Sequence, residues 1–400
     1  MQYEHITTDQ QLTDFCASLS GTDSIGFDTE FVSEDTYRPQ LCLIQVAAAD
    51  QLAVIDPLSI DDVTPFWKLL TDGSHETIVH AGREEFRFCL DATGQRPSGW
   101  FDIQIAAGFV GLEYPAAYST LIYKLLNENL PKGETRTDWR RRPLSKKQLE
   151  YALQDVMYLK PLRDLLMKGI EERGRLGWLA EELVNWQDQL ELTENTEQWR
   201  RVSGSAGLGK RQLAIVREIW RWRDAEARQK DRPPKRILRD DLIVELARRQ
   251  TDQINRIRAV RGMEHRHVQR VLPELADCVK RALERPESEC PARTRRKDAS
   301  QPPFVLLGQF LSAALGCICR SNELAPGLVG SVQDTRDLVA YRLGLAGTKP
   351  DEIPSLARGW RAEVVGKQID QLLSGETVLR IIDPKADSPL DLAPYGNSSP

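Results

Sequence analysis

Apolar and polar residues alternate over the first 60 positions in a way that is typical of β-strands. Turn candidates at Arg38–Pro39 and Ala49–Gln51 separate three apolar runs of five to eight residues, and these runs are Ser24–Phe31, Leu41–Ala47 and Leu52–Asp56. Runs of this length between turn residues indicate strands. We therefore predict three consecutive strands with antiparallel neighbours.

The pattern changes after residue 60. Helical spacing predicts helices over Asp61–Leu70, Arg83–Leu90 and Gln104–Val110, with short strands at Thr77–His80 and Trp100–Ile103 between them. From about residue 116 onward nearly every segment has a helical pattern. Strands followed by alternating strands and helices predict an α/β core with a mixed sheet flanked by helices. We expect this core to form a domain over residues 1–200.

The middle of the chain is predicted to be helical throughout. Apolar spacing indicates helices over Lys210–Arg228, Asp240–Arg249 and His265–Leu283. Pro233–Pro234 breaks the chain after the first helix, and Arg261–Met263 has the composition of a tight turn before the third. A helical domain over residues 208–286 follows from this arrangement.

The last part of the chain contains a second helical region. A polar, proline-bounded stretch at 287–302 predicts a linker. The helices expected beyond it are Phe304–Cys319, Thr335–Leu343 and Trp360–Leu373. They predict a second helical domain over 303–380. Residues 381–400 are rich in Pro, Asp and Ser, so we expect a flexible tail there.

Composition and charge refine this picture. The chain is 41% hydrophobic and 28% charged, which is typical of a globular protein. Its net charge is −5, from 54 Lys and Arg against 59 Asp and Glu. Residues 208–285, however, hold 21 basic and 12 acidic residues, so this segment carries +9 and the remainder −14. A basic module within an acidic chain favours binding of a polyanion.

The sequence also limits the compartment and the metals to consider. Seven scattered cysteines, with Cys317 and Cys319 as the only close pair, indicate reduced thiols and no zinc site. No apolar run approaches 18 residues, and Met1–Leu12 has neither a basic start nor an apolar core. We therefore expect a cytoplasmic protein without a membrane partner.

Two acids lie within the first predicted strand. Asp28 and Glu30 are two positions apart, so their side chains share one face of the strand. Apolar neighbours such as Phe27 make unpaired charges costly at this place. A divalent cation such as Mg²⁺ or Mn²⁺, which prefers oxygen ligands, would relieve the repulsion. A solvated face of an edge strand is the alternative interpretation.

Two further groups carry acids at suggestive positions. Tyr151 and Asp155 are four residues apart, so on a helix they point the same way. His80 ends a short strand, and Glu84 and Glu85 fall in the first turn of the next helix, where acids complement the helix dipole. Each group alone has an ordinary structural explanation.

The order and spacing of the three groups resemble the DEDD exonuclease superfamily in its tyrosine-containing subgroup. The segments FDTEFVSEDTYRPQLCLIQVA, LAVIDPL, IVHAGREEF, WFDIQIAA and ETRTDWRRRPLSKKQLEYALQDVMYL are similar to bacterial ribonuclease D over residues 20–165. GLGKRQLAIVREIWRWRDAEARQKDRPPKRILRDDLIVELARR resembles an HRDC domain, and GWRAEVVGKQIDQLLSG resembles the second helical domain of that family.

This resemblance implies an RNase H-like core followed by two HRDC-like helical domains. It also implies a 3′-to-5′ exoribonuclease that uses two divalent cations, Mg²⁺ or Mn²⁺, and releases nucleoside 5′-monophosphates. Asp28, Glu30 and Asp155 match metal ligands, and Tyr151 matches the residue that orients the attacking water. Glu85 stands where the family has Asp, which keeps the charge and adds one methylene group.

Several residues are candidates for contact with RNA. His80 and Arg136 lie near the acidic motifs, and the basic module contributes Lys210, Arg211, Lys235, Arg236, Arg239, Arg256 and Arg258. For any one of these, an ordinary solvated side chain is an equally simple explanation. Asp102 suits the N-cap of a helix. Trp220 suits the core better than base stacking.

Three functions remain open at this point. The first is an active exoribonuclease, acting as a monomer on tRNA precursors or other structured RNAs with 3′ extensions. The second is an RNA-binding protein of the same fold in which Glu85 weakens or abolishes catalysis. The third is a DNA 3′-to-5′ exonuclease.

Overall fold

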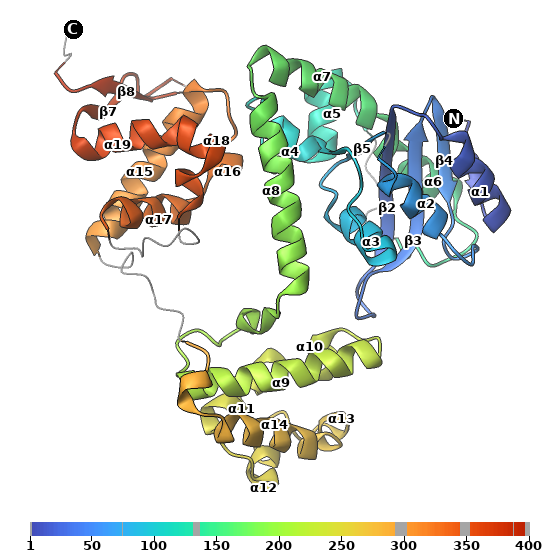
Figure 1. The fold of residues 1–400 in the computed structure, drawn as a ribbon, viewed down its shortest axis with the longest axis vertical. Helices are drawn as coiled ribbons and strands as arrows, with labels where there is room; N and C mark the ends of the chain where they lie inside the picture. The colour runs from blue at the N-terminus through green and yellow to red at the C-terminus, as the bar shows by residue number, and fades with distance from the viewer. Residues whose placement is uncertain are drawn as a thin grey trace. The chain divides into compact units, whose positions relative to one another are not determined.

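The chain forms two compact units in a computed structural model (Figure 1). The structure describes residues 2–73, 75–130, 137–292, 302–344, 353–386 and 388–396. The first unit comprises Met1–Glu30, Cys42–Asp188 and Arg296–Pro400. The second comprises Phe31–Leu41 and Gln189–Arg295. No helix among the described residues combines the length and the apolar character needed to cross a membrane.

A six-stranded mixed sheet forms the centre of the first unit. Its strands are β1 Glu4–Ile6, β2 Ser24–Val32, β3 Gln40–Ala48, β4 Gln51–Ile55, β5 Glu76–Val79 and β6 Trp100–Asp102. Their order across the sheet is β1-β4-β3-β2-β5-β6. β3 and β4 are antiparallel, whereas β1 with β4, β2 with β5, and β5 with β6 are parallel. The predicted mixed sheet is confirmed.

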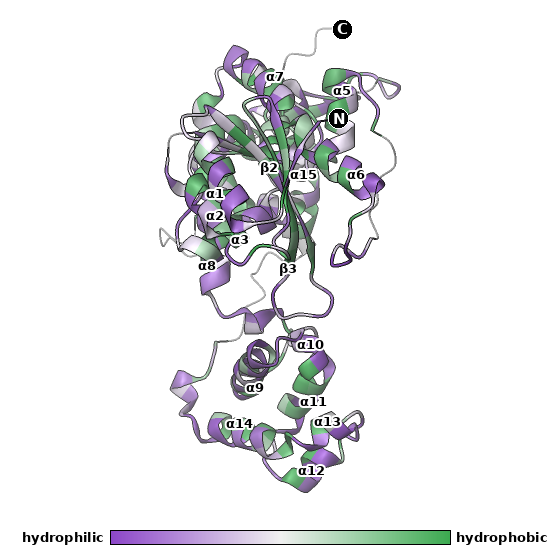
Figure 2. Cartoon of the chain, turned by 90° about the vertical axis from the view of Figure 1, so that its right-hand side faces the viewer, coloured by the Kyte–Doolittle hydropathy of each residue, from purple (hydrophilic) through white to green (hydrophobic). Residues whose placement is uncertain are grey.

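Helices cover both faces of this sheet. They are α1 Asp9–Ser18, α2 Thr64–Thr71, α3 Arg83–Thr93, α4 Ile103–Gly108, α5 Tyr118–Leu126, α6 Lys146–Met157, α7 Leu159–Glu172 and α8 Leu176–Asn195. Figure 2 shows the sheet edge-on, with α1, α2 and α3 on one side and α5 and α6 on the other. Strands with helices on both faces are apolar on both, which explains the long apolar runs of β2 and β3.

The side chains of β2 divide between these two layers. Phe27 packs edge-to-face on Phe66 and Trp67 of α2, with ring centroids 5.7 and 6.0 Å away. Gly26 faces the other layer, because a Cβ at this position would lie 3.1 Å from Leu159 of α7. Since successive strand residues alternate in direction, Thr29 shares the side of Phe27. Asp28 and Glu30 share the side of α6 and α7.

The predicted boundaries agree with the structure where apolar runs are long. The three early strands are each confirmed to within a residue or two. The sequence prediction missed β1 and α1, because β1 has only three residues and α1 buries little besides Leu12 and Phe15. α2 begins at Thr64 and not at residue 61, because Pro65 stands in its first turn, where a proline is tolerated.

The second unit is a helical bundle with a core of its own. Its helices are α9 Lys210–Gln229, α10 Pro234–Ile237, α11 Asp240–Arg249, α12 Ile254–Arg258, α13 Arg266–Gln269 and α14 Leu272–Glu284, with 3₁₀ turns at Gln198–Arg201 and Glu287–Glu289. Apolar residues from α9, α11 and α14 form one buried cluster. The prediction of one helix over His265–Leu283 is wrong. α13 and α14 are separate, because Pro273 fits only the first turn of a new helix.

The C-terminal region packs within the first unit. It contains α15 Pro302–Ser321, α16 Pro326–Val329, α17 Val332–Arg342, a 3₁₀ turn Ser355–Ala357, α18 Gly359–Arg361, a π-helical turn Ala362–Gly366, α19 Lys367–Ser374, β7 Thr377–Ile381 and β8 Leu390–Pro394. Trp360 is buried between Phe109 and Trp178, with centroids 5.0 and 5.9 Å away. Arg361 pairs with Glu182 of α8 at 2.6 Å.

Two expectations for this region need correction. The prediction of a wholly helical domain with a flexible tail is wrong at its end, because β8 pairs antiparallel with β7 from Thr377↔Pro394 to Ile381↔Leu390. The single helix expected over Trp360–Leu373 is divided by the π-helical turn. The linker expected at 287–302 falls in part on residues 293–301, which lie outside the described residues.

Candidate active site

Two acids lie on the face of β2 that turns toward α6 and α7. Asp28 and Glu30 are two positions apart in a regular strand, and both are half-buried. The neighbouring positions Phe27 and Thr29 point to the opposite layer and are buried there. The strand therefore presents two carboxylates side by side on one face, as the sequence predicted.

α6 brings a third acid and a phenol to the same side of the sheet. Its N-terminus is fixed by Ser145 and Gln148, whose side chains cap each other's backbone N–H groups. Two turns further on, Tyr151 and Asp155 share one face of the helix, and the Tyr151 hydroxyl donates a hydrogen bond to the Asp155 carboxylate.

α3 contributes Glu85 from the other helical layer. Glu85 lies in the first turn of this helix and is only 5% exposed. Its Oε1 accepts a hydrogen bond of 2.5 Å from the hydroxyl of Thr29. Glu84, the preceding acid, forms an ion pair with Arg87 at 3.0 Å. Of the two glutamates in this turn, Glu85 is thus the one that faces β2.

Burial raises the pKa of all four carboxylates, and neighbouring acids of the cluster raise the pKa of Asp28 and Glu30 further. Burial raises the pKa of Asp28, and the negative charges of Glu85, Asp155 and Glu30 raise it further. Burial, Asp155 and Glu85 raise the pKa of Glu30 to about 8. Burial raises the pKa of Asp155 to about 7 and that of Glu85 to about 7. The fold thus brings these acids from β2, α3 and α6 within electrostatic reach of one another.

This cluster has the chemistry of a site for a hard divalent cation. Carboxylate oxygens are the ligands that Mg²⁺ and Mn²⁺ prefer. Among the largest influences on the pKa values of the four acids, none comes from a lysine or an arginine. In the part of the chain that the structure describes, no three His, Cys, Asp or Glu side chains are already grouped so that they could hold an ion. The predicted ligand set therefore stays a prediction.

The loop before α6 is held by Arg142. Its guanidinium forms a two-pronged ion pair with Asp56 at 2.5 and 2.7 Å. It also donates to the carbonyl oxygens of Cys42 and Trp139, both at 2.7 Å. The Trp139 ring, which is 5% exposed, lies 6.3 Å from the ring of Tyr151. Arg140–Arg142 are expected from the sequence to lie in a polar loop that contacts phosphate or forms exposed ion pairs. The pairing of Arg142 with Asp56 could not be predicted, because the two residues are 86 positions apart.

His80 and Asp102 brace the turn that leads into α3. Nε2 of His80 lies 3.0 Å from the carbonyl oxygen of Ala116. The Asp102 carboxylate accepts hydrogen bonds from the backbone N–H groups of Ala81, Gly82 and Gln104. The prediction that Asp102 caps a helix is confirmed, since it is the N-cap of α4. The suggested contact of His80 with RNA stays a prediction.

Tyr118, at the start of α5, is a second phenol beside the cluster. Its ring lies 5.3 Å from that of His80. Burial raises its pKa, and the charges of Asp155 and Asp28 raise it further. Sequence analysis missed both Tyr118 and Thr29. Tyr118 belongs to no recognised motif, and Thr29 is the unspecified middle residue of the Asp-x-Glu pair. Only the folded chain reveals their neighbours.

The cationic candidates of the second unit differ in their environments. Arg211 donates to the carbonyl oxygens of Ala282 and Arg285, so it has a bracing role within this unit. Arg236 pairs with Asp35 at 2.8 Å. The Lys235 side chain is 78% exposed, with its nearest acid 4.0 Å away.

Two further candidates are Lys210 and Arg136. Lys210 lines a surface cavity of about 530 Å³ together with Gln250 and Glu287. Arg136 lies outside the described residues. Arg239 pairs with Asp241 at 2.9 Å. The candidates with open surroundings are thus Lys235, Lys210, Arg256 and Arg258, all of which are exposed.

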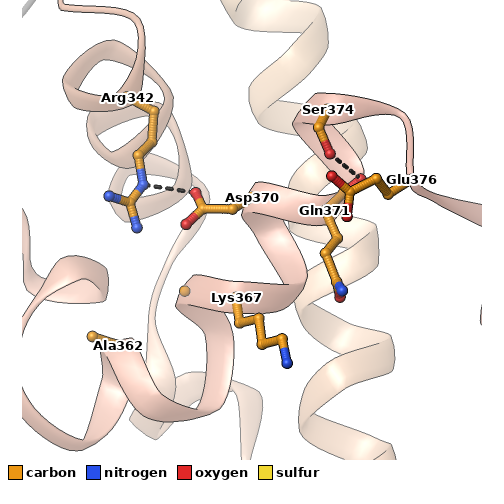
Figure 3. Close-up of a pocket in the computed structure, with 8 residues that line it drawn as sticks. Arg342, Ala362, Lys367, Asp370, Gln371, Ser374 and Glu376 are labelled. Atoms are coloured by element: carbon orange, nitrogen blue, oxygen red, sulfur yellow. Dashed lines mark hydrogen bonds and ion pairs between the residues drawn. The ribbon is translucent and has the colours of Figure 1, made fainter.

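Another cavity lies in the C-terminal region. It has a volume of about 510 Å³ and is bordered by the π-helical turn and α19. Figure 3 shows Arg342 paired with Asp370 at one side and Lys367 at another. None of its lining residues belongs to the carboxylate cluster. The acids of the cluster, and not this cavity, therefore mark the candidate active site.

Comparisons with known proteins show which families the parts of this chain match. Residues 3–171 match the family described as 3′-5′ exonuclease, and residues 212–279 match the HRDC domain. The chain is 30% identical to the ribonuclease D of Gluconacetobacter diazotrophicus over 379 residues, which cover 94% of each protein. It is also 30% identical to the ribonuclease D of Escherichia coli strain K12, over 93% of this chain and 99% of the other.

A solved structure extends the likeness to the fold. The crystal structure of Escherichia coli RNase D, described as an exoribonuclease involved in structured RNA processing, matches with a TM-score of 0.82 at 29% identity. It covers 94% of this chain and 99% of its own. The predicted core sheet and the helical region with an HRDC domain are both confirmed by these matches. The HRDC-like character of the C-terminal region stays a prediction.

Proposed function

Because this chain belongs to the ribonuclease D family, and is therefore a 3′-5′ exonuclease, we propose that it hydrolyses RNA from the 3′ end at the carboxylate cluster of β2, α3 and α6. One observation supports this location of the active site. Four acids and the Tyr151 phenol, far apart in the sequence, come within electrostatic reach of one another in the fold.

In this proposal each acid has a role toward bound cations. Asp28, Glu30 and Asp155 would hold one divalent cation, and Asp28 with Glu85 would hold a second. Such a pair, of Mg²⁺ or Mn²⁺, would supply activation of a water molecule and stabilisation of charge on the leaving oxygen. The raised pKa values of the acids mean that they release protons as the cations bind. Metal binding should therefore strengthen as the pH rises.

Tyr151 orients the water that attacks the phosphate. Burial and the charges of Asp155 and Glu30 raise the pKa of Tyr151, so its phenol remains protonated at neutral pH. It therefore cannot serve as the base. The phenol donates a hydrogen bond to the Asp155 carboxylate, so a lone pair of the phenol oxygen can accept a hydrogen bond from water. The water oxygen bonds to phosphorus and the bond to the 3′ oxygen breaks. The water loses one proton and the 3′ oxygen gains one from solvent, so the products are a nucleoside 5′-monophosphate and a chain with a new 3′ hydroxyl.

Structured RNA with a 3′ extension, such as a tRNA precursor, is the proposed substrate. The relative of known structure is described as acting in structured RNA processing. An active site that removes terminal nucleotides binds only a short part of a long RNA. The other phosphates of the RNA therefore need basic side chains outside the active site. Residues 208–285 carry a net charge of +9 and include the exposed Lys235. We propose that this segment holds the body of the RNA.

Glu85 favours one alternative function. Its longer side chain stands where the family has Asp, and its Oε1 is taken by Thr29. A displacement of about 1 Å at such a site can cost roughly 10²-fold in rate. A protein of this fold that binds RNA and hydrolyses it slowly is therefore the second candidate. If the glutamate weakens the site, Glu85→Asp raises turnover substantially.

A time course on a 3′-labelled RNA tests the proposal. We expect the full-length protein to release mononucleotides with Mg²⁺ or Mn²⁺ and none with EDTA. Asp28→Asn should abolish release, whereas Asp164→Asn, an exposed acid paired with Lys160 on α7, should leave it unchanged. A matched DNA oligomer tests the DNA alternative, because the 2′ hydroxyl distinguishes the two polymers. Release that persists in EDTA or in Asp28→Asn would refute the proposal.

A further inference from the structure

Thr29 lies between two acids of the site and points to the other side of the sheet. It is 5% exposed, and its neighbours Asp28 and Glu30 face the layer of α6 and α7. Its own side chain faces the layer of α2 and α3. The hydroxyl is therefore directed away from two of the carboxylates and toward the helix that carries Glu85.

α3 approaches β2 where the neighbouring strand has ended. β5 stops at Val79, and the last pair between the two strands is Gly26 with Ile78. β2 continues to Val32, so its edge beyond this point is open to another element. The first turn of α3 follows three residues after β5 and places Glu85 there, within reach of Thr29.

The hydrogen bond between the two residues defines the direction of the Glu85 carboxylate. Thr29 Oγ1 lies 2.5 Å from Oε1, a short distance typical of a hydroxyl that donates to a carboxylate. A carboxylate has two oxygens, so fixing Oε1 leaves Oε2 to act elsewhere. Asp28 is the residue next to Thr29 in β2, so a carboxylate held at Thr29 lies close to Asp28 along the strand.

A glutamate needs such an anchor more than an aspartate does. Its extra methylene group adds a rotatable bond, so an unanchored Glu85 would sample several directions and lose entropy when it engages an ion. We propose that Thr29 is a positioning residue, whose hydroxyl anchors Oε1 of Glu85 so that Oε2 stays available beside Asp28. This inference rests on the proposed function, since it assigns Thr29 a role in that site.

Two substitutions separate the hydroxyl from the shape of the side chain. Thr29→Val keeps the branched shape and removes the donor, and Thr29→Ser keeps the donor and removes a methyl group. In the full-length protein with Mn²⁺, we expect Thr29→Val to lower kcat about 10- to 100-fold with KM for RNA unchanged, consistent with the cost of a small misplacement. It should also raise the Mn²⁺ concentration needed for half-maximal turnover. Thr29→Ser should recover most of the loss.

A double-mutant cycle with Glu85→Gln tests whether Thr29 acts through Glu85. If it does, Thr29→Val costs little once Glu85→Gln is present, and the double variant resembles Glu85→Gln alone. An equal loss in both backgrounds would overturn the proposal, because Thr29 would then act independently of Glu85. So would turnover by Thr29→Val equal to that of the wild type. Melting temperatures of all variants separate this effect from a general loss of folding.

Calorimetric titration with Mn²⁺ in the absence of RNA tests the role of Thr29 independently of catalysis. We expect Thr29→Val to weaken Mn²⁺ binding in the wild-type background and to change it little in the Glu85→Gln background. Equal binding by the wild type and Thr29→Val would overturn the role of Thr29. If the wild type binds Mn²⁺ and hydrolyses no RNA, the proposed function fails, and this titration still tests the anchor.

Discussion

Each carboxylate of the cluster makes the metal-free protein less stable at neutral pH. The pKa values of Glu30, Asp155 and Glu85 are raised to about 8, 7 and 7, well above those of an unfolded chain. A carboxyl group with a raised pKa stabilises the folded state at a pH below its pKa in the unfolded chain, near pH 4. This stabilisation is lost as the pH rises through the pKa of the group in the folded chain. The metal-free protein should therefore become less stable between about pH 4 and pH 8. A bound cation should reverse the loss.

Asp28→Asn tests this electrostatic cost. The substitution removes one of four mutually repelling charges, so we expect it to raise the melting temperature of the first unit in EDTA at pH 8 by about 2–5 °C, as a gain of about 1–2 kcal/mol implies. At pH 5, where most of these acids are protonated, the gain should be much smaller. Scanning calorimetry at both pH values measures the difference. A variant that melts below the wild type at pH 8 would contradict the account, because the charge of Asp28 would then be stabilising.

Some features of the candidate site could be predicted from the sequence, and others are visible only in the folded chain. The periodicities of strand and helix predict that Asp28 and Glu30 share one face, and that Tyr151 and Asp155 share another. The roles of these residues come from the family resemblance and stay predictions. The anchor at Thr29 could not be predicted, since it depends on where α3 meets the open edge of β2. The same holds for Tyr118, whose neighbours come from other elements.

Among the elements, the loop before α6 depends most on one residue. Arg142 pairs with Asp56, whose side chain is 2% exposed, and with two backbone carbonyl oxygens. Burial raises the pKa of Asp56, and the hydrogen bonds from Arg142 more than offset this, so the pKa is lowered overall. Without Arg142, the buried carboxylate of Asp56 would lose its guanidinium partner. Loss of such a partner typically costs about 3–5 kcal/mol.

Arg142→Ala should therefore loosen the loop that packs Trp139 beside Tyr151. We expect its unfolding free energy to fall by about 2–4 kcal/mol, and kcat to fall about tenfold or more because Tyr151 loses its neighbour. Arg141→Ala is the matched control, since the Arg141 side chain is 85% exposed and should change stability by less than about 0.5 kcal/mol. Denaturant titration and single-turnover hydrolysis measure both effects. Equal behaviour of the two variants would show that the pairing with Asp56 has no such role.

Secondary structure could be predicted where long apolar runs or clear breaks define it. β2, β3 and α11 agree closely with expectation, because continuous burial or strong amphipathicity marks each of them. β7 and β8 were missed, since their burial is partial and their residues lie among Pro, Asp and Ser. Their pairing, and not their composition, makes them strands.

At the scale of the whole molecule, charge is distributed unevenly between parts of the chain. The segment 208–285 carries +9 and the remainder −14. Several of the arginines in this segment are engaged in ion pairs or carbonyl contacts, as Arg211 and Arg236 illustrate. Affinity for RNA should therefore depend on the more exposed cations, of which Lys235 is the clearest example.

Lys235→Ala should weaken RNA binding and reduce its salt dependence. A lysine that contacts a phosphate contributes about one counterion, so we expect the slope of log affinity against log salt to fall by about one. Lys68→Ala, an exposed lysine of α2, serves as the control and should leave the slope unchanged. Filter binding of RNA to the metal-free protein, at a series of salt concentrations, measures this slope for both variants. A slope that is the same in Lys235→Ala and the wild type would exclude this lysine from the RNA surface.

We propose that acids from β2, α3 and α6 together hold divalent cations. Crystals of the full-length protein soaked in Mn²⁺ test it most directly, because anomalous scattering locates the ion without reference to activity. The account predicts a peak within coordination distance of carboxylate oxygens of both Asp28 and Asp155, and its loss in Asp28→Asn. A protein saturated with Mn²⁺ in which no peak touches both residues would contradict the account.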